Sequence, residues 1–360
     1  MSHRLGRLLC ILALLIILPI LTGCSAQTVE IEDGVPLSIP TADGADQIAH
    51  PTVIDFTVEY GLEGWGGYRY WMSASPYPGA DDYHENPCLW VSDDGTQWKM
   101  VQGLAHPLVE VPEKYRKRSV YHSDPSIVYN PRTDVIELYY RESQGRSEDA
   151  AVVLHRIDIS AQSDQHDTDR FHYTVTEVAL STPSFTRVST CLSPSVVIDD
   201  EGTHIMFAVG NASGTSGVSA FEVMVMQGGV DGVAYGAPRV CREVDDRFIE
   251  SAEGFGPNAP WHLTAKRDPH SSEIALLING QSFGEGRRLR NLYWAFTNFD
   301  NPTAMTYPQT TPLLRGQSGW QPYRSAFVLA DFEHEDSLRL WLNVYTTPTQ
   351  VWSIVYLGGN

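Results

Sequence analysis

The hydrophobic positions along this chain fall into short runs rather than long helical stretches. Apolar and aromatic residues come in groups of about four to eight, separated by Gly, Asp, Asn and Pro, which is the pattern of β-strands bounded by turns. In residues 338–345 aliphatic side chains alternate with other types: Leu or Val stands at every even position, and Arg, Trp, Asn and Tyr stand at the odd ones. No segment carries a convincing helical period, so the pattern predicts an all-β protein.

One local pattern recurs five times, which makes the chain an internal repeat. A small or polar residue is followed by proline and then by an apolar strand. The copies are His50-Pro51, Asp124-Pro125, Ser193-Pro194, Ala259-Pro260 and Tyr323-Arg324, the last with arginine in place of proline. Proline fits here because the first residue of a strand can lack a ladder donor.

Each repeat continues with a second and a third strand. The second strands are predicted at 67–73, 136–141, 204–209, 273–279 and 338–345, and the third at 87–92, 151–157, 220–226, 292–297 and 351–357. Five units of three or four antiparallel strands predict a five-bladed β-propeller over residues 48–360. A β-sandwich is the competing fold, but it gives no reason for a five-fold repeat.

Two segments of these repeats resemble the five-bladed glycosidase superfamily, which includes glycoside hydrolase families 43, 32 and 130. One is residues 68–72 with Glu85-Asn86-Pro87, and the other is residues 122–129 with residues 137–141. The resemblance covers roughly residues 48–357. It implies a propeller fold and a glycan as the ligand.

The N-terminus has a different character. Arg4 and Arg7 precede an apolar run over residues 8–21, which is the layout of a secretory signal and is short for a membrane span. Its end, Leu21-Thr22-Gly23-Cys24, resembles the lipobox of bacterial lipoproteins. That resemblance implies cleavage before Cys24 and acylation, such as palmitate, on this cysteine. We expect a signal peptide over 1–23, a lipidated N-terminus and tether over 24–47, and an extracytoplasmic, membrane-anchored protein.

The amino-acid composition limits the kinds of molecule that this protein is expected to bind. The formal net charge of -19 argues against nucleic acid, and against membrane contact other than through the lipid. We expect a monomer that binds an oligo- or polysaccharide. The cysteines downstream of Cys24 show no metal-ligand spacing and are expected to be buried and inert; they are Cys88, Cys191 and Cys241.

In a propeller the first strand of each blade lines the central channel, so the repeat positions converge at one end of it. We predict Asp124 and Glu85 as paired catalytic carboxylates, since glycoside hydrolysis needs two carboxyl groups about the scissile bond. Arginines would orient substrate, aromatic rings would stack on sugars, and histidines would assist proton transfer. The predicted substrate-binding residues are His50, Tyr83, His122, Arg141, Trp261, His262, Tyr323 and Arg324. We assign no metal ligands and no cofactor, and leave open only a structural cation on the propeller axis.

The candidate site departs from the family 43 pattern. Those enzymes carry acids at the starts of blades 1 and 2 and a glutamate in blade 3, whereas this chain has His50 and Ser193 at two of these positions. Only Asp124 matches. The sequence therefore favours a glycoside hydrolase with a divergent site, and the alternatives are a non-catalytic glycan-binding lipoprotein for adhesion or uptake and a structural propeller. A buried Arg324 is expected to pair with Asp124 or Glu85.

Overall fold

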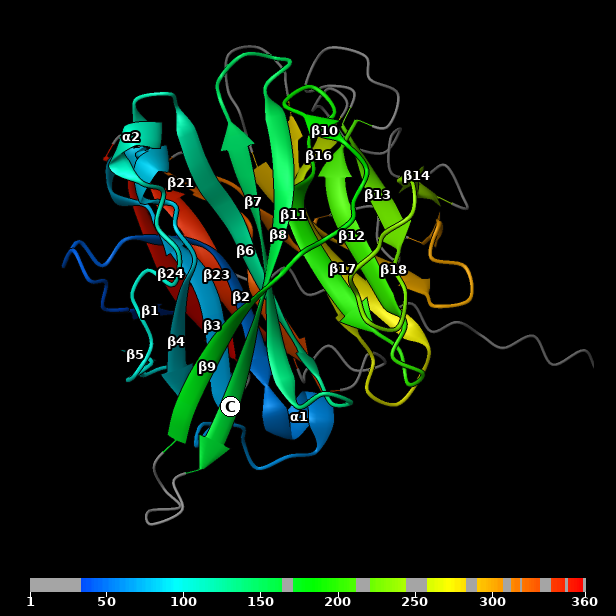
Figure 1. Ribbon diagram of the computed structural model, residues 1–360, viewed down its shortest axis with the longest axis horizontal. Helices are drawn as coiled ribbons and strands as arrows, with labels where there is room; N and C mark the ends of the chain where they lie inside the picture. The colour runs from blue at the N-terminus through cyan, green and yellow to red at the C-terminus, as the bar shows by residue number, and fades with distance from the viewer. Residues whose placement is uncertain are drawn as a thin grey trace, which may run out of the picture.

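Five antiparallel sheets surround a central axis in the computed structural model of the chain, as the blades of a β-propeller (Figure 1). The first strands of the blades contact one another in a closed ring, and the last contacts the first. The predicted five-bladed architecture is thereby confirmed. The structure describes residues 34–163, 171–211, 221–243, 258–282, 290–306, 312–317, 319–330, 338–346 and 349–358.

Blades 1 to 4 are each built from one continuous segment of the chain, with short outer strands at their edges. Blade 1 contains β2 (Ile48–Asp55), β3 (Tyr70–Pro76), β4 (Cys88–Ser92) and β5 (Lys99–Met100). Blade 2 contains β6 (Val120–Asn130), β7 (Val135–Gln144) and β8 (Ala151–Ser163), and β8 also pairs with β9 (Phe171–Val178) and β10 (Phe185–Thr186). Blade 3 contains β11 (Leu192–Ile198), β12 (His204–Gly210), β13 (Glu222–Gln227) and β14 (Arg239–Val240). Blade 4 contains β16 (Asn258–Arg267), β17 (Glu273–Ser282), β18 (Arg290–Asn298) and β20 (Leu314–Arg315). A parallel pair, β15 (Arg242–Glu243) with β19 (Ala304–Met305), lies beside blades 3 and 4.

Blade 5 joins the two ends of the described chain. It contains β21 (Trp320–Pro322), β22 (Ala326–Leu329), β23 (Leu338–Thr346) and β24 (Val351–Gly358). Its outer strand is β1 (Val35–Leu37), which pairs with β24 in the register Val35↔Tyr356. The range 24–47, expected as the lipidated N-terminus and tether, therefore contributes a strand to the propeller.

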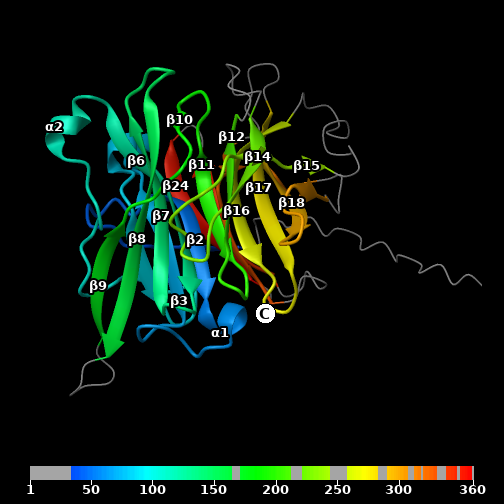
Figure 2. The same ribbon diagram turned by 45° about the vertical axis from the view of Figure 1, so that its right-hand side comes forward.

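Helical structure is limited to short connections. Helix α1 (Phe56–Tyr60) follows β2 directly, and the Asp55 carboxylate caps it by accepting from the amides of Thr57 and Val58. Helix α2 (Glu113–Arg116) precedes β6, so α1 and α2 mark opposite ends of the propeller (Figures 1 and 2). Two 3-10 turns, Pro78–Ala80 and Asp82–His84, lie in the loop before β4. No helix in the described ranges is long and apolar enough to cross a membrane.

The hydrophobic core is divided among the blade interfaces. Five principal clusters of buried side chains fill the five interfaces between neighbouring blades, which is how a propeller buries both faces of each sheet. Large aromatic residues fill them best; Trp71 packs between blades 1 and 2 and Trp341 between blades 5 and 1. The three cysteines in these interfaces are buried and unpaired, as expected; they are Cys88, Cys191 and Cys241.

The repeat positions form bulges at the starts of the first strands. The register shifts at this point in blades 1 to 4. In three blades the bulged residue has a left-handed backbone although it is not glycine: His50 (φ 59), Asp124 (φ 55) and Ser193 (φ 51). Such backbone strain is uncommon and gathers at functional sites. The bulges turn these three side chains toward the axis at the end of the propeller that holds α2.

Candidate functional site

Asp124 is the centre of a buried cluster on the propeller axis. Its Oδ1 lies 3.1 Å from Nδ1 of His50 and 3.3 Å from Nδ1 of His262. The three side chains come from β6, β2 and β16, in blades 2, 1 and 4. Each offers one ligand atom, and these atoms all lie within 4.8 Å of one another. The topology thus brings together one carboxylate and two imidazoles far apart in sequence.

Glu85 approaches the same cluster from the loop before β4. Its Oε1 lies 2.9 Å from Nε2 of His50, so this one imidazole ring contacts both predicted catalytic carboxylates. If Nε2 carries the proton and donates to Glu85, Nδ1 presents a lone pair toward Asp124. Nδ1 of His50 is buried, and within the described ranges it has no hydrogen-bond partner. Two lone pairs 3.1 Å apart repel unless a proton or a cation lies between them.

The four titratable groups influence one another strongly. Burial lowers the pKa of His50, but Asp124 and Glu85 outweigh it, and the net shift is upward. Burial raises the pKa of Glu85 to about 7, although the hydrogen bond with His50 opposes the shift. Burial would also raise the pKa of Asp124, yet His50 and His262 hold it well below its usual range. Burial lowers the pKa of His262 to about 3 against the influence of Asp124. Near neutral pH Asp124 is therefore ionised and His262 is uncharged.

Ser193 completes the inner surface without forming a catalytic triad. Its hydroxyl lies 2.7 Å from Nδ1 of His262 and 3.4 Å from Oδ1 of Asp124. A triad would place the serine and the carboxylate on opposite ring nitrogens. Here both contact Nδ1, while Nε2 of His262 is buried and has no hydrogen-bond partner in the described part of the chain. The arrangement orients the ring and does not activate Ser193 as a nucleophile.

The two predicted arginines occupy different positions. Nη1 of Arg141 lies 3.5 Å from Oδ2 of Asp124, so Arg141 is the arginine partner of this carboxylate. The expected pairing of Arg324 with Asp124 or Glu85 is wrong. Arg324 instead donates from Nε to the carbonyl oxygen of Leu263 at 3.1 Å and from Nη1 to that of Pro125 at 3.0 Å. Its side chain is 1% exposed and bonds backbone carbonyls because it crosses the axis between first strands.

Aromatic residues from blades 4 and 5 cover one side of the imidazoles. The Tyr323 ring lies edge-on to His262 at 4.4 Å between centroids and to His50 at 5.1 Å. Trp261 donates from its indole nitrogen to the Tyr323 hydroxyl at 3.3 Å and stacks on Phe221. Tyr323 is buried and Trp261 is half-buried, so Trp261 keeps the more accessible ring of the two.

Two predicted residues lie apart from the cluster, between blades 1 and 2. His122 Nδ1 is 3.1 Å from Oδ1 of Asn86, and its Nε2 is 3.4 Å from Oε2 of Glu142. Tyr83 lies half-buried in the 3-10 turn before Glu85, with the Arg146 guanidinium 6.0 Å from its ring centre. Asn86 is not among the predicted site residues. Its Oδ1 contacts His122 and also accepts a hydrogen bond from the amide of Val111, so Asn86 connects His122 to the loop before β6.

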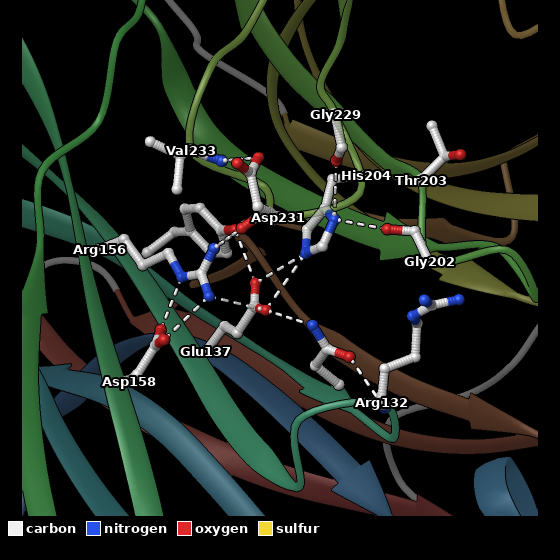
Figure 3. Close-up of polar contacts among 12 residues, drawn as sticks. Arg132, Glu137, Arg156, Asp158, Gly202, Thr203, His204, Gly229, Asp231 and Val233 are labelled. Carbon is white, nitrogen blue, oxygen red and sulfur yellow. Dashed lines mark hydrogen bonds and ion pairs between the residues drawn. The ribbon is translucent and has the colours of Figure 1, made fainter.

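A second buried cluster of similar composition joins blades 2 and 3 (Figure 3). Glu137 of β7 accepts from Nε2 of His204 at 3.0 Å and pairs with Arg156 at 2.9 Å. Both carboxylate oxygens receive further hydrogen bonds, from Asn130 and from the Tyr139 hydroxyl. The sequence did not predict this cluster, because Glu137 and His204 lie 67 residues apart in different repeats.

The cluster around Asp124 has the chemistry of a divalent-metal site. Two histidines and one carboxylate form a known ligand set for transition metals. A ligand must be deprotonated, which holds for Asp124 and for the neutral His262. The pKa of His50 is raised by Asp124 and Glu85, so a cation would have to displace a proton from this ring. The unpartnered nitrogens of His50 and His262 are buried where a cation could use them. These residues therefore fit a divalent cation, although the sequence assigned no metal ligand here.

Comparison with known proteins identifies similar chains of two kinds. No protein-family model matches this chain. Over 352 residues it is 26% identical to the A type blood N-acetyl-α-D-galactosamine deacetylase of Flavonifractor plautii, a match that covers 89% of this chain and 43% of that protein. The chain therefore spans less than half the length of this curated relative.

Solved structures share the propeller. The crystal structure of an N-acetylgalactosamine deacetylase from F. plautii in complex with blood group B trisaccharide matches with a TM-score of 0.66 and 21% identity, covering 90% of this chain and 94% of that one. A thermostable family-43 glycoside hydrolase matches with a TM-score of 0.52 and 11% identity, covering 86% and 88%. The fold expected from the family resemblance is thus confirmed, and the residue roles remain predictions.

Proposed function

We propose that this protein hydrolyses the N-acetyl group of an amino sugar within a glycan, at the cluster of His50, Asp124 and His262. The observation that carries the proposal is this buried set of one carboxylate and two imidazoles. The similarity to a galactosamine deacetylase supports the same reaction class. Amide hydrolysis requires polarisation of the carbonyl and activation of a water, and a cation site supplies both.

The same geometry disfavours the glycoside hydrolase predicted from the sequence. That mechanism requires two carboxyl groups on either side of the scissile bond, with room for sugar and water. Glu85 and Asp124 do lie near each other, but the His50 ring contacts both, at 2.9 and 3.1 Å. A sugar cannot enter between them while His50 holds this position. The two carboxylates are therefore placed to orient and polarise the His50 ring, and they are poorly placed to flank a glycosidic bond.

Each polar residue of the cluster has a definite task in this proposal. Asp124, His50 and His262 would hold a divalent cation, which supplies Lewis acidity for amide hydrolysis when bound. Glu85 accepts from Nε2 of His50 and so fixes the ring with Nδ1 toward Asp124, a common role of a carboxylate behind a ligating histidine. Ser193 orients His262 in the same way. Trp261 offers a ring face to the sugar.

A paired assay tests this proposal. Residues 26–360, which keep every described strand of the propeller, are incubated with Mn²⁺, Co²⁺ or Zn²⁺ and with glycans that carry N-acetylgalactosamine or N-acetylglucosamine. We expect free acetate and new amines without new reducing ends. Arabinan and xylan are the matched substrates for the hydrolase alternative. Release of reducing ends without acetate contradicts the proposal, and binding without either product favours the non-catalytic glycan-binding protein.

We also propose that the propeller is held at a bacterial membrane, outside the cytoplasm, by lipid on Cys24. The lipobox-like sequence supports this, and Cys24 lies outside the described residues. Since β1 begins at Val35, the linker between lipid and propeller would be shorter than the predicted tether. Metabolic labelling with a palmitate analogue tests the anchor: incorporation should disappear in Cys24→Ala.

A further inference from the structure

Arg324 occupies the one repeat position where arginine replaces proline, at the start of the blade 5 first strand. Its hydrogen bonds go to blade 4, through the carbonyl of Leu263, and to blade 2, through the carbonyl of Pro125. Blades 5 and 2 are not neighbours in the ring of first strands. This side chain therefore spans the propeller axis. Lys266 of blade 4 also reaches a non-adjacent blade, through the Val53 carbonyl and Glu59 of blade 1, but those residues lie outside the cluster.

The two carbonyls belong to the residues that directly follow two members of the proposed cation site. Pro125 follows Asp124, and Leu263 follows His262. Tyr323, the residue before Arg324, packs its ring against His262 and His50. Tyr323 and Arg324 together thus contact β2, β6 and β16, the three strands that carry the cluster. A displacement of Arg324 would therefore change the distances between cluster residues of different blades, while the strand pairing inside each blade could stay as it is.

We infer that Arg324 is a positioning residue: by bridging the carbonyls of Pro125 and Leu263 across the axis, it sets the separation of Asp124 and His262. The inference rests on the proposed function, because that separation matters most if the cluster holds a cation. The planar guanidinium presents donors in a fixed fork, whereas a lysine ammonium is a single flexible point. Burial of this cation without a carboxylate partner is unfavourable, and it lowers the pKa of Arg324 to about 10.

The test compares Arg324→Met and Arg324→Lys with a matched control, Arg156→Met. Arg156 is also a buried arginine that joins two blades, but it belongs to the Glu137 cluster. The affinity for Co²⁺ is measured by absorption titration, and stability by urea unfolding with chelator present. We expect both Arg324 variants to bind Co²⁺ about 10- to 100-fold more weakly, the range for residues behind metal ligands. Arg156→Met should lose as much stability or more, with Co²⁺ affinity within about two-fold of wild type.

Two outcomes overturn the inference: Arg324→Lys that binds Co²⁺ as wild type does, or Arg156→Met that weakens binding as much as Arg324→Met. If the wild-type protein itself binds no Co²⁺, the proposed cation site fails, and the positioning role is judged without metal. Ring ¹⁵N spectra of the histidines then decide it. The His50 and His262 signals should move in Arg324→Met and stay in place in Arg156→Met, which should move His204 instead. Unmoved His50 and His262 signals in Arg324→Met contradict the inference.

Discussion

The described part of the chain holds two buried clusters of carboxylate and histidine, one on the propeller axis around Asp124 and one between blades 2 and 3 around Glu137. They differ in how completely their hydrogen bonds are satisfied. In the Glu137 cluster both carboxylate oxygens accept hydrogen bonds, and both ring nitrogens of His204 face oxygen atoms. In the Asp124 cluster, by contrast, two imidazole nitrogens lack a hydrogen-bond partner in the described part of the chain; they are Nδ1 of His50 and Nε2 of His262.

This difference separates a structural role from a functional one. Buried polar groups are normally satisfied, because each unsatisfied group carries a free-energy penalty of about 1–3 kcal/mol. The Glu137 cluster follows that rule and joins blade 2 to blade 3. The Asp124 cluster violates it where the backbone is also strained, since His50, Asp124 and Ser193 have left-handed φ values. Composition alone would not distinguish the two clusters, whereas the count of bonded atoms does.

The largest expected effect is on stability, at the satisfied cluster. Glu137→Ala removes the more buried of two carboxylates that pair with Arg156, leaving Asp158 as the other, and removes the acceptor that faces His204. Loss of one partner of a buried ion pair typically destabilises a protein by about 3–5 kcal/mol. Urea unfolding monitored by tryptophan fluorescence should show this loss, while deacetylase activity of the folded fraction stays near wild type. A loss below about 1 kcal/mol would remove the structural half of the comparison.

The next effect is on activity, at the unsatisfied cluster. Asp124→Asn preserves the shape of the side chain but removes the charge shared by His50 and His262. We expect deacetylation to fall at least about 100-fold, since even residues behind metal ligands contribute up to that factor. Acetate release at saturating glycan measures the change, with Glu137→Gln as the control. An active Asp124→Asn would show that the strained aspartate only closes a turn.

A third effect concerns pH. Although burial opposes it, His204 and Arg156 lower the pKa of Glu137 below its ordinary value of 4.5. The folded state then binds fewer protons than the unfolded state, so the stabilisation is present above pH 4.5 and is lost as pH falls through the lower folded pKa. Each unit of depression corresponds to about 1.4 kcal/mol. Melting temperatures between about pH 3 and 7 should therefore decline more steeply for wild type than for Glu137→Gln; parallel curves would contradict the assignment.

The smallest effect is expected at the rim. Tyr83 is half-buried near Arg146 and is predicted to stack on a sugar. An aromatic contact of this kind contributes about 0.5–1.5 kcal/mol, so Tyr83→Ala should raise KM by up to about ten-fold and leave kcat nearly unchanged. Initial rates over a range of glycan concentrations measure both constants. A fall in kcat with unchanged KM would place Tyr83 within the reacting centre.

The sequence predicted the repeated part of the molecule well. All ten second and third strands were found, and observed strands such as β7 and β23 begin within one residue of prediction. The repeat positions also gathered His50, Asp124, His262 and Tyr323 at one place, because topology alone brings first strands together.

What the sequence did not predict depends on side-chain direction and on contacts between repeats. The three-residue strand β1 has too few residues for a periodic signal. The position of His50 between Glu85 and Asp124 follows from a bulge with a left-handed backbone, which no local pattern indicates. Arg324 was expected to find a carboxylate, but at its depth on the axis the nearest acceptors are backbone carbonyls.

The pairing of β1 with β24 has a consequence for the order of events during synthesis. Blades 1 to 4 are each contiguous in sequence, so each can form as soon as its own residues are available. Blade 5 requires Val35–Leu37 and Val351–Gly358 together, two segments separated by all four other blades. Closing so long a loop is entropically costly and slow. The ring, and with it the axis where Arg324 meets blades 2 and 4, can therefore be completed only after β24 has been made.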